Sequence, residues 1–204
     1  SFDTVVGQSH VTDTLEHEVT SGNLAQALLF CGPKGVGKTS CARILAKMIN
    51  ELDSDAEENY ELNIFELDAA SNNKVDDIRQ LIDQVRFAPQ IGRFKVYIID
   101  EVHMLSTAAF NAFLKTLEEP PAHAIFILAT TEKHKVLPTI LSRCQVFDFK
   151  RIGIQDIVSH LEFVASKEGV VAESEALHLI AEKADGALRD SLSESYSVTS
   201  RTAE

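Results

Sequence analysis

The chain has 204 residues, 45% of them hydrophobic and 25% charged, enough for one domain of about 150 residues and a partial second. A formal net charge of −12 argues against a protein that grips nucleic acid over its whole surface, and no apolar run of about 18 residues predicts a membrane span. The three cysteines show no C-x-x-C spacing and the first residues lack the features of a signal peptide, so we expect no disulfide framework, no zinc ribbon and a cytoplasmic location.

Apolar spacing predicts that helices and strands alternate along the first three quarters of the chain. Val11, Leu15 and Val19 repeat at helical spacing, and the apolar run Ala27–Cys31 is typical of a buried strand. Further helices are predicted near 39–50, 75–85 and 110–117, and further strands at 64–67, 94–99, 124–129 and 145–149. This alternation indicates an α/β fold in which a parallel sheet carries helices on both faces.

After residue 150 the pattern changes to helices alone, at 154–167, 173–184 and from 187 onward. We therefore predict two domains, an α/β domain over 1–149 and a small helical lid domain over 150–204. The stretch 191–204 is rich in Ser and Thr and has few apolar residues, so we expect the lid domain to be frayed or incomplete there.

A glycine-rich segment between the first predicted strand and the next helix matches the pattern G-x-x-x-x-G-K-[ST]. Its glycines let backbone N–H groups turn towards phosphate oxygens, and the helix N-terminus adds the positive end of its dipole. Lys38 would contact the β- and γ-phosphates, and Thr39 would ligate Mg²⁺. Because both flanks fit, we prefer a nucleotide site to a chance match. The residues of this site are Gly32, Pro33, Lys34, Gly35, Val36, Gly37, Lys38, Thr39 and Ser40.

Two acids follow directly on the predicted strand at 94–99. The carboxyl ends of strands are where open α/β sheets bind ligands. Asp100 would hold Mg²⁺, and Glu101 would orient a water for attack on the γ-phosphate. The alternative is that both acids merely cap the strand, and the phosphate-binding segment makes this less probable.

Three further polar residues have two readings each. Thr130 and Thr131 end the strand at 124–129. A hydroxyl there would contact the γ-phosphate, or the two residues are merely β-branched residues that close a strand. Arg189 would fold back onto the nucleotide, or lie in solvent paired with Asp185 or Asp190. Local sequence alone slightly favours the solvated arginine.

Arg143 raises a separate question, because it stands among apolar neighbours with no acid within five residues upstream. The nearest acid downstream is Asp148, which would make a surface salt bridge with it.

An acidic loop follows the second helix and contains Glu51, Asp53, Asp55, Glu57 and Glu58. It lacks the glycine and ligand spacing of a calcium loop, so we expect a solvated segment there.

These residues together resemble the AAA+ ATPases, and within them the gamma/tau subunits of the bacterial DNA polymerase III clamp loader. The matching segments are 2–8, 32–39, 100–121, 128–131 and 141–144, so the resemblance spans about 2–190. Ser-Arg-Cys at 142–144 is shared by clamp-loader subunits, and Asp-Glu-Val-His-Met-Leu-Ser at 100–106 narrows the resemblance to gamma/tau. It implies a P-loop AAA+ sheet followed by the lid.

The resemblance also implies a role for each matched residue. Val5 and Val6 would line the adenine pocket, and Thr131 and Arg189 would be sensor 1 and sensor 2. Asp100 and Glu101 would form the Walker B pair beside the phosphate-binding Lys38 and the Mg²⁺ ligand Thr39. The partner of Arg143 would be the ATP of a neighbouring subunit, so that this arginine acts in trans.

The sequence departs from the gamma/tau pattern in two ways. Gamma/tau subunits usually carry four zinc-binding cysteines between the helix after the P-loop and the next strand, and residues 50–63 contain none, so we expect no zinc. The helical collar domain that assembles the pentamer is also absent from these 204 residues. Whether the chain by itself is a monomer stays open, as do its nucleotide state and the origin of the 191–204 stretch.

The resemblance implies the ATPase motor module of a replicative sliding-clamp loader, with ATP and Mg²⁺ as cofactors. Its partners would be delta, delta-prime, further gamma/tau copies, the sliding clamp and primer-template DNA, with no membrane. One alternative is a scaffold subunit that binds nucleotide without hydrolysing it, which the intact Lys38, Thr39, Asp100 and Glu101 disfavour. Another is a different AAA+ ring such as a branch-migration helicase, which the Asp-Glu-Val-His string disfavours.

Overall fold

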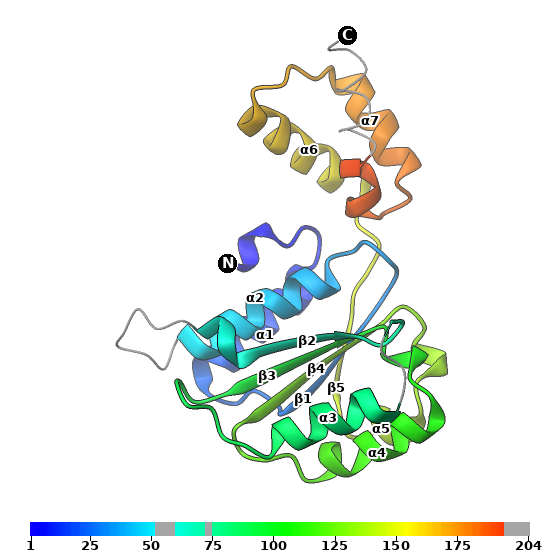
Figure 1. The fold of residues 1–204 in the computed structure, drawn as a ribbon. Coiled ribbons are helices and arrows are strands. Elements are labelled where there is room, and N and C mark those ends of the chain that lie inside the picture. The colour runs from blue at the N-terminus through cyan, green and yellow to red at the C-terminus, as the bar shows by residue number, and fades with distance from the viewer. Residues whose placement is uncertain (52–59, 72–74, 194–204) are drawn as a thin grey trace.

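The computed structural model describes residues 1–51, 60–71 and 75–193. A five-stranded sheet lies between two layers of helices, and the helices α6 (Ile154–Glu168) and α7 (Ser174–Lys183) stand apart from these layers (Figure 1). All neighbouring strands are parallel, in the order β2-β3-β4-β1-β5. The strands are β1 (Ala27–Cys31), β2 (Ile64–Asp68), β3 (Lys95–Asp100), β4 (Ala124–Thr130) and β5 (Gln145–Asp148).

Alternation along the strands divides the sheet domain into two cores. Leu29, Tyr97 and Leu128 face the layer of α3 (Val75–Val85), α4 (Thr107–Glu118) and the short α5 (Pro138–Leu141). Residues one position along, such as Leu28 and Ile127, face α1 (Ser9–Ser21) and α2 (Lys38–Glu51). Burial on both faces explains why the central strands β1 and β4 are apolar almost throughout rather than alternating in polarity.

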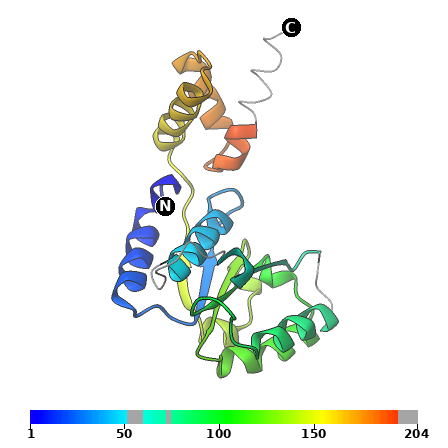
Figure 2. The ribbon, with the colours of Figure 1, turned by 60° about the vertical axis from the view of Figure 1, so that its left-hand side comes forward.

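The lid has a core of its own, formed where α6 packs on α7. Its buried residues include Ile157, Leu161 and Leu177, and residues 188–193 form a further helical turn. The sheet core ends at Phe149 and the lid core begins at Ile152, so the connection between them is short. Figure 2 shows this connection as a single extended segment that leads from β5 to α6.

The buried side chain of Gln8 holds this connection in place. Its Nε2 donates to Lys150 O at 2.7 Å and its Oε1 accepts from Lys150 N at 3.1 Å. Nε2 also lies 3.4 Å from the carbonyl oxygen of Val36 in the glycine-rich segment. One fully buried amide therefore joins the start of α1 to the segment between the sheet and the lid.

The predicted α/β fold with a helical lid is confirmed, and each predicted helix and strand has a counterpart within about three residues at either end. The sequence patterns did not reveal α5 or the short 3-10 helices η1 (Phe2–Thr4), η2 (Tyr60–Asn63), η3 (Val102–Met104) and η4 (Lys133–Lys135), because single turns are too short for a periodic signal. Most of the acidic loop, at 52–59, and the stretch 194–204 lie outside the described residues. Within the described part of the chain, no helix has the length and apolarity needed to cross a membrane.

Candidate nucleotide-binding site

The glycine-rich segment, or P-loop, connects the carboxyl end of β1 to the start of α2. Gly35 has a φ of +77°, and a Cβ there would lie 3.1 Å from Cβ of Ala187 in the lid. Only glycine combines this left-handed backbone with so close an approach. The P-loop therefore lies directly against the lid, and its conformation depends on glycine at this position.

Lys38 lies at the first position of α2 with its side chain inside the P-loop. Its Nζ donates to Gly32 O at 2.8 Å and to Pro33 O at 2.5 Å. Burial lowers the pKa of the Lys38 ammonium, and the nearby Arg189 acts in the same direction, while Glu101 and Asp100 oppose both. A cation held in this way is placed to meet the phosphate oxygens of a nucleotide.

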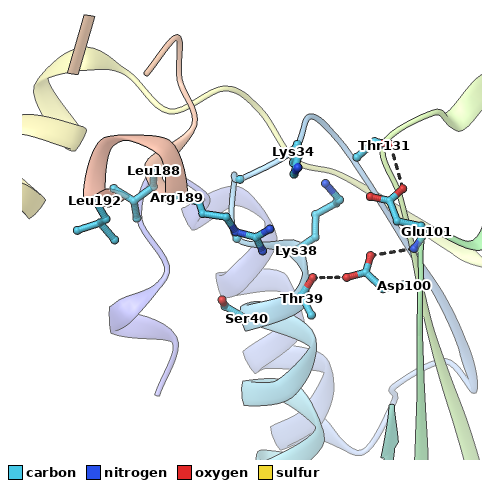
Figure 3. A pocket seen from close by; sticks show the side chains of 12 residues that line it. Lys34, Lys38, Thr39, Ser40, Asp100, Glu101, Thr131, Leu188, Arg189 and Leu192 are labelled. Carbon is cyan, nitrogen blue, oxygen red and sulfur yellow. Dashed lines mark hydrogen bonds between the residues drawn. The ribbon is translucent and has the colours of Figure 1, made fainter. Parts of the chain in front are cut away.

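Asp100 ends β3 beside the P-loop and is joined to it by a hydrogen bond. Thr39 Oγ1 donates to Asp100 Oδ2 at 2.6 Å (Figure 3). A hydroxyl and a carboxylate so close together are the hard oxygen ligands that Mg²⁺ prefers beside phosphates. The structure brings Thr39 and Asp100 together, and their role as Mg²⁺ ligands stays a prediction.

Glu101 has a left-handed backbone, with φ of 50° and ψ of 44°, and it caps the single turn η3. Its backbone N–H donates to Asp100 Oδ1 at 2.9 Å. Thr131 Oγ1 donates to Glu101 Oε2 at 3.0 Å, so the residue directly after β4 reaches the residue directly after β3. Thr130 is instead fully buried, and its hydroxyl oxygen accepts from Glu132 N at 3.0 Å.

Arg189 comes from the lid and extends into the same cavity as Lys38 and Thr39 (Figure 3). Its backbone N–H donates to Gly35 O at 3.4 Å. Asp185, one of the two acids considered as its partner, pairs instead with Arg151. The cavity has a volume of about 270 Å³, and the P-loop, both acids, Thr131 and the lid side chains Leu188, Arg189 and Leu192 line it.

Arg143 lies away from this cavity, on the exposed turn between α5 and β5. One of its guanidinium nitrogens is 2.6 Å from Glu118 Oε1 at the end of α4, and another donates to Thr139 O at 2.8 Å. The suggested pairing with Asp148 is wrong, because Asp148 pairs with Lys133 at 2.9 Å. The partner within this chain is 25 residues upstream, so local sequence could not identify it.

Two family profiles cover most of the chain. The profile of the DNA polymerase III delta subunit matches residues 7–153, and that of the DNA polymerase III clamp loader subunit ATPase lid domain matches 156–193. The chain belongs to the clamp-loader ATPase family of DNA polymerase III. Both the sheet domain and the lid thus have counterparts in that family.

Curated relatives agree with this family. The chain is 51% identical over 205 residues to DNA polymerase III subunit tau of Bacillus subtilis and 47% identical over 206 residues to that of Escherichia coli. It is 42% identical to subunit gamma of Buchnera aphidicola subsp. Baizongia pistaciae. These matches cover 94–95% of the chain, which spans about a third of the tau subunits (36% and 32%) and about half (55%) of that gamma subunit.

Solved structures support the AAA+ fold. The Thermotoga maritima RuvB Holliday junction branch migration motor matches 94% of the chain and 61% of its own length, with a TM-score of 0.72 and 23% identity. A DNA polymerase III gamma subunit-related protein of Thermotoga maritima matches 89% of the chain and 61% of its own, with a TM-score of 0.58 and 23% identity. At these identities the comparison concerns the fold alone.

The remaining predicted nucleotide contacts lie around the cavity rather than in its lining. Val5 packs against the core under α1 and α2, and Val6 packs against the lid core, so the pair lies where the sheet domain meets the lid. Val36 is 1% exposed, which leaves only its backbone for a P-loop contact. Adenine contact by Val5 and Val6 stays a prediction.

Two polar residues near the site did not stand out in the sequence. His103 is buried beside Glu101 and Thr130, and Gln8 is buried between the P-loop and the lid connection. The only signal for His103 was its position two residues after Glu101 in the family string. The only signal for Gln8 was its position directly before the predicted amphipathic helix that contains Val11, Leu15 and Val19.

The described residues contain no cluster of three or more His, Cys, Asp or Glu side chains that would hold a metal ion. Burial raises the pKa of the Cys31 thiol to about 11 and that of Cys144 to about 12. Such thiols stay protonated near neutral pH and are poor nucleophiles. All three cysteines of the sheet domain pack in or against its two cores.

Proposed function

We propose that this chain is the ATPase motor module of a replicative sliding-clamp loader, a part of the DNA polymerase III holoenzyme that works in the cytoplasm. It would bind ATP and Mg²⁺ and couple hydrolysis to the loading of a sliding clamp on primer-template DNA. The observation that carries the proposal is the convergence of Lys38, Thr39, Asp100 and Glu101 with the lid residue Arg189 on one cavity. Family membership supports the same conclusion.

The described residues divide the work of phosphoryl transfer among them. Backbone N–H groups of the P-loop and the Lys38 ammonium would bind the phosphates, and Thr39 with Asp100 would hold Mg²⁺, which neutralises developing charge. Glu101 would orient the attacking water, because its carboxylate lies at the edge of the cavity with Thr131 bound to one oxygen. Arg189 would contact the phosphates from the lid, so that nucleotide bridges both parts of the chain.

Arg143 would complete the site of the next subunit. Its side chain is one-third exposed, so a neighbouring copy can reach it. An arginine supplied in trans stabilises charge in the transition state. We propose delta, delta-prime and further gamma/tau copies as the neighbouring subunits.

The competing proposal is a scaffold subunit that binds nucleotide without turnover. The complete set of phosphate, metal and water-positioning residues favours hydrolysis. The deciding experiment measures ATPase activity of the chain alone, and then of the full-length subunit with delta, delta-prime, clamp and primed DNA. Low activity alone and strong stimulation in the complex support the proposal, whereas nucleotide binding without turnover in the complex supports the scaffold.

A further inference from the structure

Next to the proposed catalytic acid lies a buried histidine with an acidic group facing each ring nitrogen. His103 belongs to η3, and its side chain is only 5% exposed. Its Nδ1 lies 2.9 Å from Thr130 Oγ1 and 3.4 Å from Glu101 Oε2. Its Nε2 lies 3.2 Å from Glu132 Oε2. The ring therefore connects Glu101, directly after β3, to Thr130 at the end of β4 and to Glu132 two residues later.

The two contacts to Glu101 meet on the same oxygen. Thr131 Oγ1 and His103 Nδ1 both lie against Oε2, at 3.0 and 3.4 Å. No hydrogen bond to Oε1 is formed by any residue that the structure describes, and the Glu101 side chain is 29% exposed. A carboxylate held at one oxygen presents the other in a defined direction, which is what the orientation of an attacking water requires.

The groups that hold His103 are themselves fixed. Thr130 is fully buried, and its hydroxyl oxygen also accepts from Glu132 N at 3.0 Å. Glu132 binds Lys135 at 2.9 Å through the carboxylate oxygen that faces His103. With both nitrogens engaged and little free surface, the imidazole has one orientation available to it.

We infer that His103 is a positioning residue for hydrolysis, which through Nδ1 holds the Glu101 carboxylate in the orientation that directs water at the γ-phosphate. The inference rests on the proposed function, because Glu101 needs a direction only if ATP is hydrolysed. His103 does not line the cavity, so it acts through Glu101 and not on the substrate.

The test places His103→Ala, His103→Asn and His103→Gln in the full-length subunit, assembled with delta, delta-prime, clamp and primed DNA. Asn places an amide nitrogen where Nδ1 lies and can keep the contacts to Thr130 and Glu101, whereas Gln reaches only the Nε2 position beside Glu132. We expect His103→Ala to lower kcat about 10- to 100-fold with KM for ATP nearly unchanged. Asn restores most of kcat, and Gln does not.

His123→Ala is the matched control, because His123 is a partly buried histidine whose Nε2 makes one contact, at 2.8 Å, to Val85 O far from the cavity. It should leave kcat unchanged. Thermal unfolding of every variant identifies loss of folding, and the near-isosteric Asn and Gln variants keep the comparison valid if the Ala variant unfolds.

Three results separate the two proposals. An assembled wild-type complex that does not hydrolyse ATP overturns the proposed function and the role of His103 with it. An active wild-type complex in which His103→Ala keeps its kcat overturns the role of His103 alone. Restoration by Gln but not by Asn shows that the Glu132 contact matters instead, which also overturns the inference.

Discussion

Two arginines of this chain, Arg189 and Arg143, have opposite surroundings. Arg189 belongs to the helical turn at 188–193 and enters the cavity formed by the P-loop of its own chain. Arg143 lies on the turn between α5 and β5, and its guanidinium is bound by Glu118 and the carbonyl oxygen of Thr139. Each was ambiguous in the sequence, with a solvated salt bridge as the plain alternative.

On the proposed function, this difference would let one chain supply two kinds of phosphate-binding cation, one to its own nucleotide and one to that of a neighbouring subunit. Glycine at position 35 lets the P-loop approach Ala187 closely, two residues before Arg189 in the lid. Arg143 has no anion site within the described chain other than Glu118, an exposed pair worth about 0–1 kcal/mol. So weak a contact would readily yield to a phosphate of a neighbouring subunit, and four predictions test this contrast.

The largest effect is expected for Arg143→Ala in the assembled loader. A trans arginine contributes about 10³- to 10⁵-fold in rate, so ATP hydrolysis should fall by that order while each subunit still binds ATP. The measurement is steady-state ATPase activity beside nucleotide binding. Arg79→Ala, which removes an exposed arginine paired with Asp76 on α3, is the control. Wild-type turnover in the assembled Arg143→Ala variant would show that the arginine does not act in trans.

Glu101→Gln should have the next largest effect. The amide keeps the shape of the side chain but cannot take a proton from water, which costs about 10²- to 10⁴-fold in kcat. ATP binding should persist, so the variant should trap unhydrolysed ATP, as measured by recovery of bound nucleotide. Unchanged turnover would remove Glu101 from the mechanism and would leave Thr131 with a structural contact only.

Arg189→Ala should weaken ATP binding by the chain alone, which Arg143→Ala should not. A hydrogen bond from a charged donor contributes about 1.5–3 kcal/mol, or roughly 10- to 150-fold in Kd. Titration with a fluorescent ATP analogue measures this change. Lys183→Ala, which removes an exposed cation from the end of α7, is the matched control. Equal affinities in the Arg189→Ala variant and the wild type would contradict the cis assignment.

The smallest effect is expected for Glu118→Ala. Both side chains of the Arg143–Glu118 pair are substantially exposed, at 33% and 48%, so the free energy of unfolding should change by less than about 1 kcal/mol. Urea denaturation measures it. A loss above about 2 kcal/mol would mean that Arg143 has a structural role in its own chain, and would weaken the contrast with Arg189.

Residue types and short-range spacing in the sequence were sufficient to predict much of the candidate site. The glycine pattern from Gly32 to Thr39 predicted a phosphate loop, and the acids after an apolar strand predicted the position of Asp100. Each feature is contained in a few consecutive residues of the chain, where spacing fixes geometry. The adenine contacts of Val5 and Val6 were implied by the family resemblance alone, and the structure places them at the junction with the lid.

The contacts that join distant segments could not be predicted in this way. Glu118 as the partner of Arg143, Thr131 as the partner of Glu101, and Gln8 between the P-loop and Lys150 all link residues at least 25 positions apart. The Thr131–Glu101 contact follows from the parallel strand order, which puts β3 beside β4 with their carboxyl ends aligned. The other contacts depend on how the helices and connections pack around the sheet.

The sequence by itself thus determined the alternation of buried strands and amphipathic helices, the P-loop and the acid pair, because these depend on residue type and short-range spacing. Only the tertiary structure decided which arginine enters the cavity, which threonine reaches Glu101 and where His103 lies. The physical reason is that a side chain finds its partner in three dimensions, and strand order and lid packing set that arrangement rather than the residues next to it.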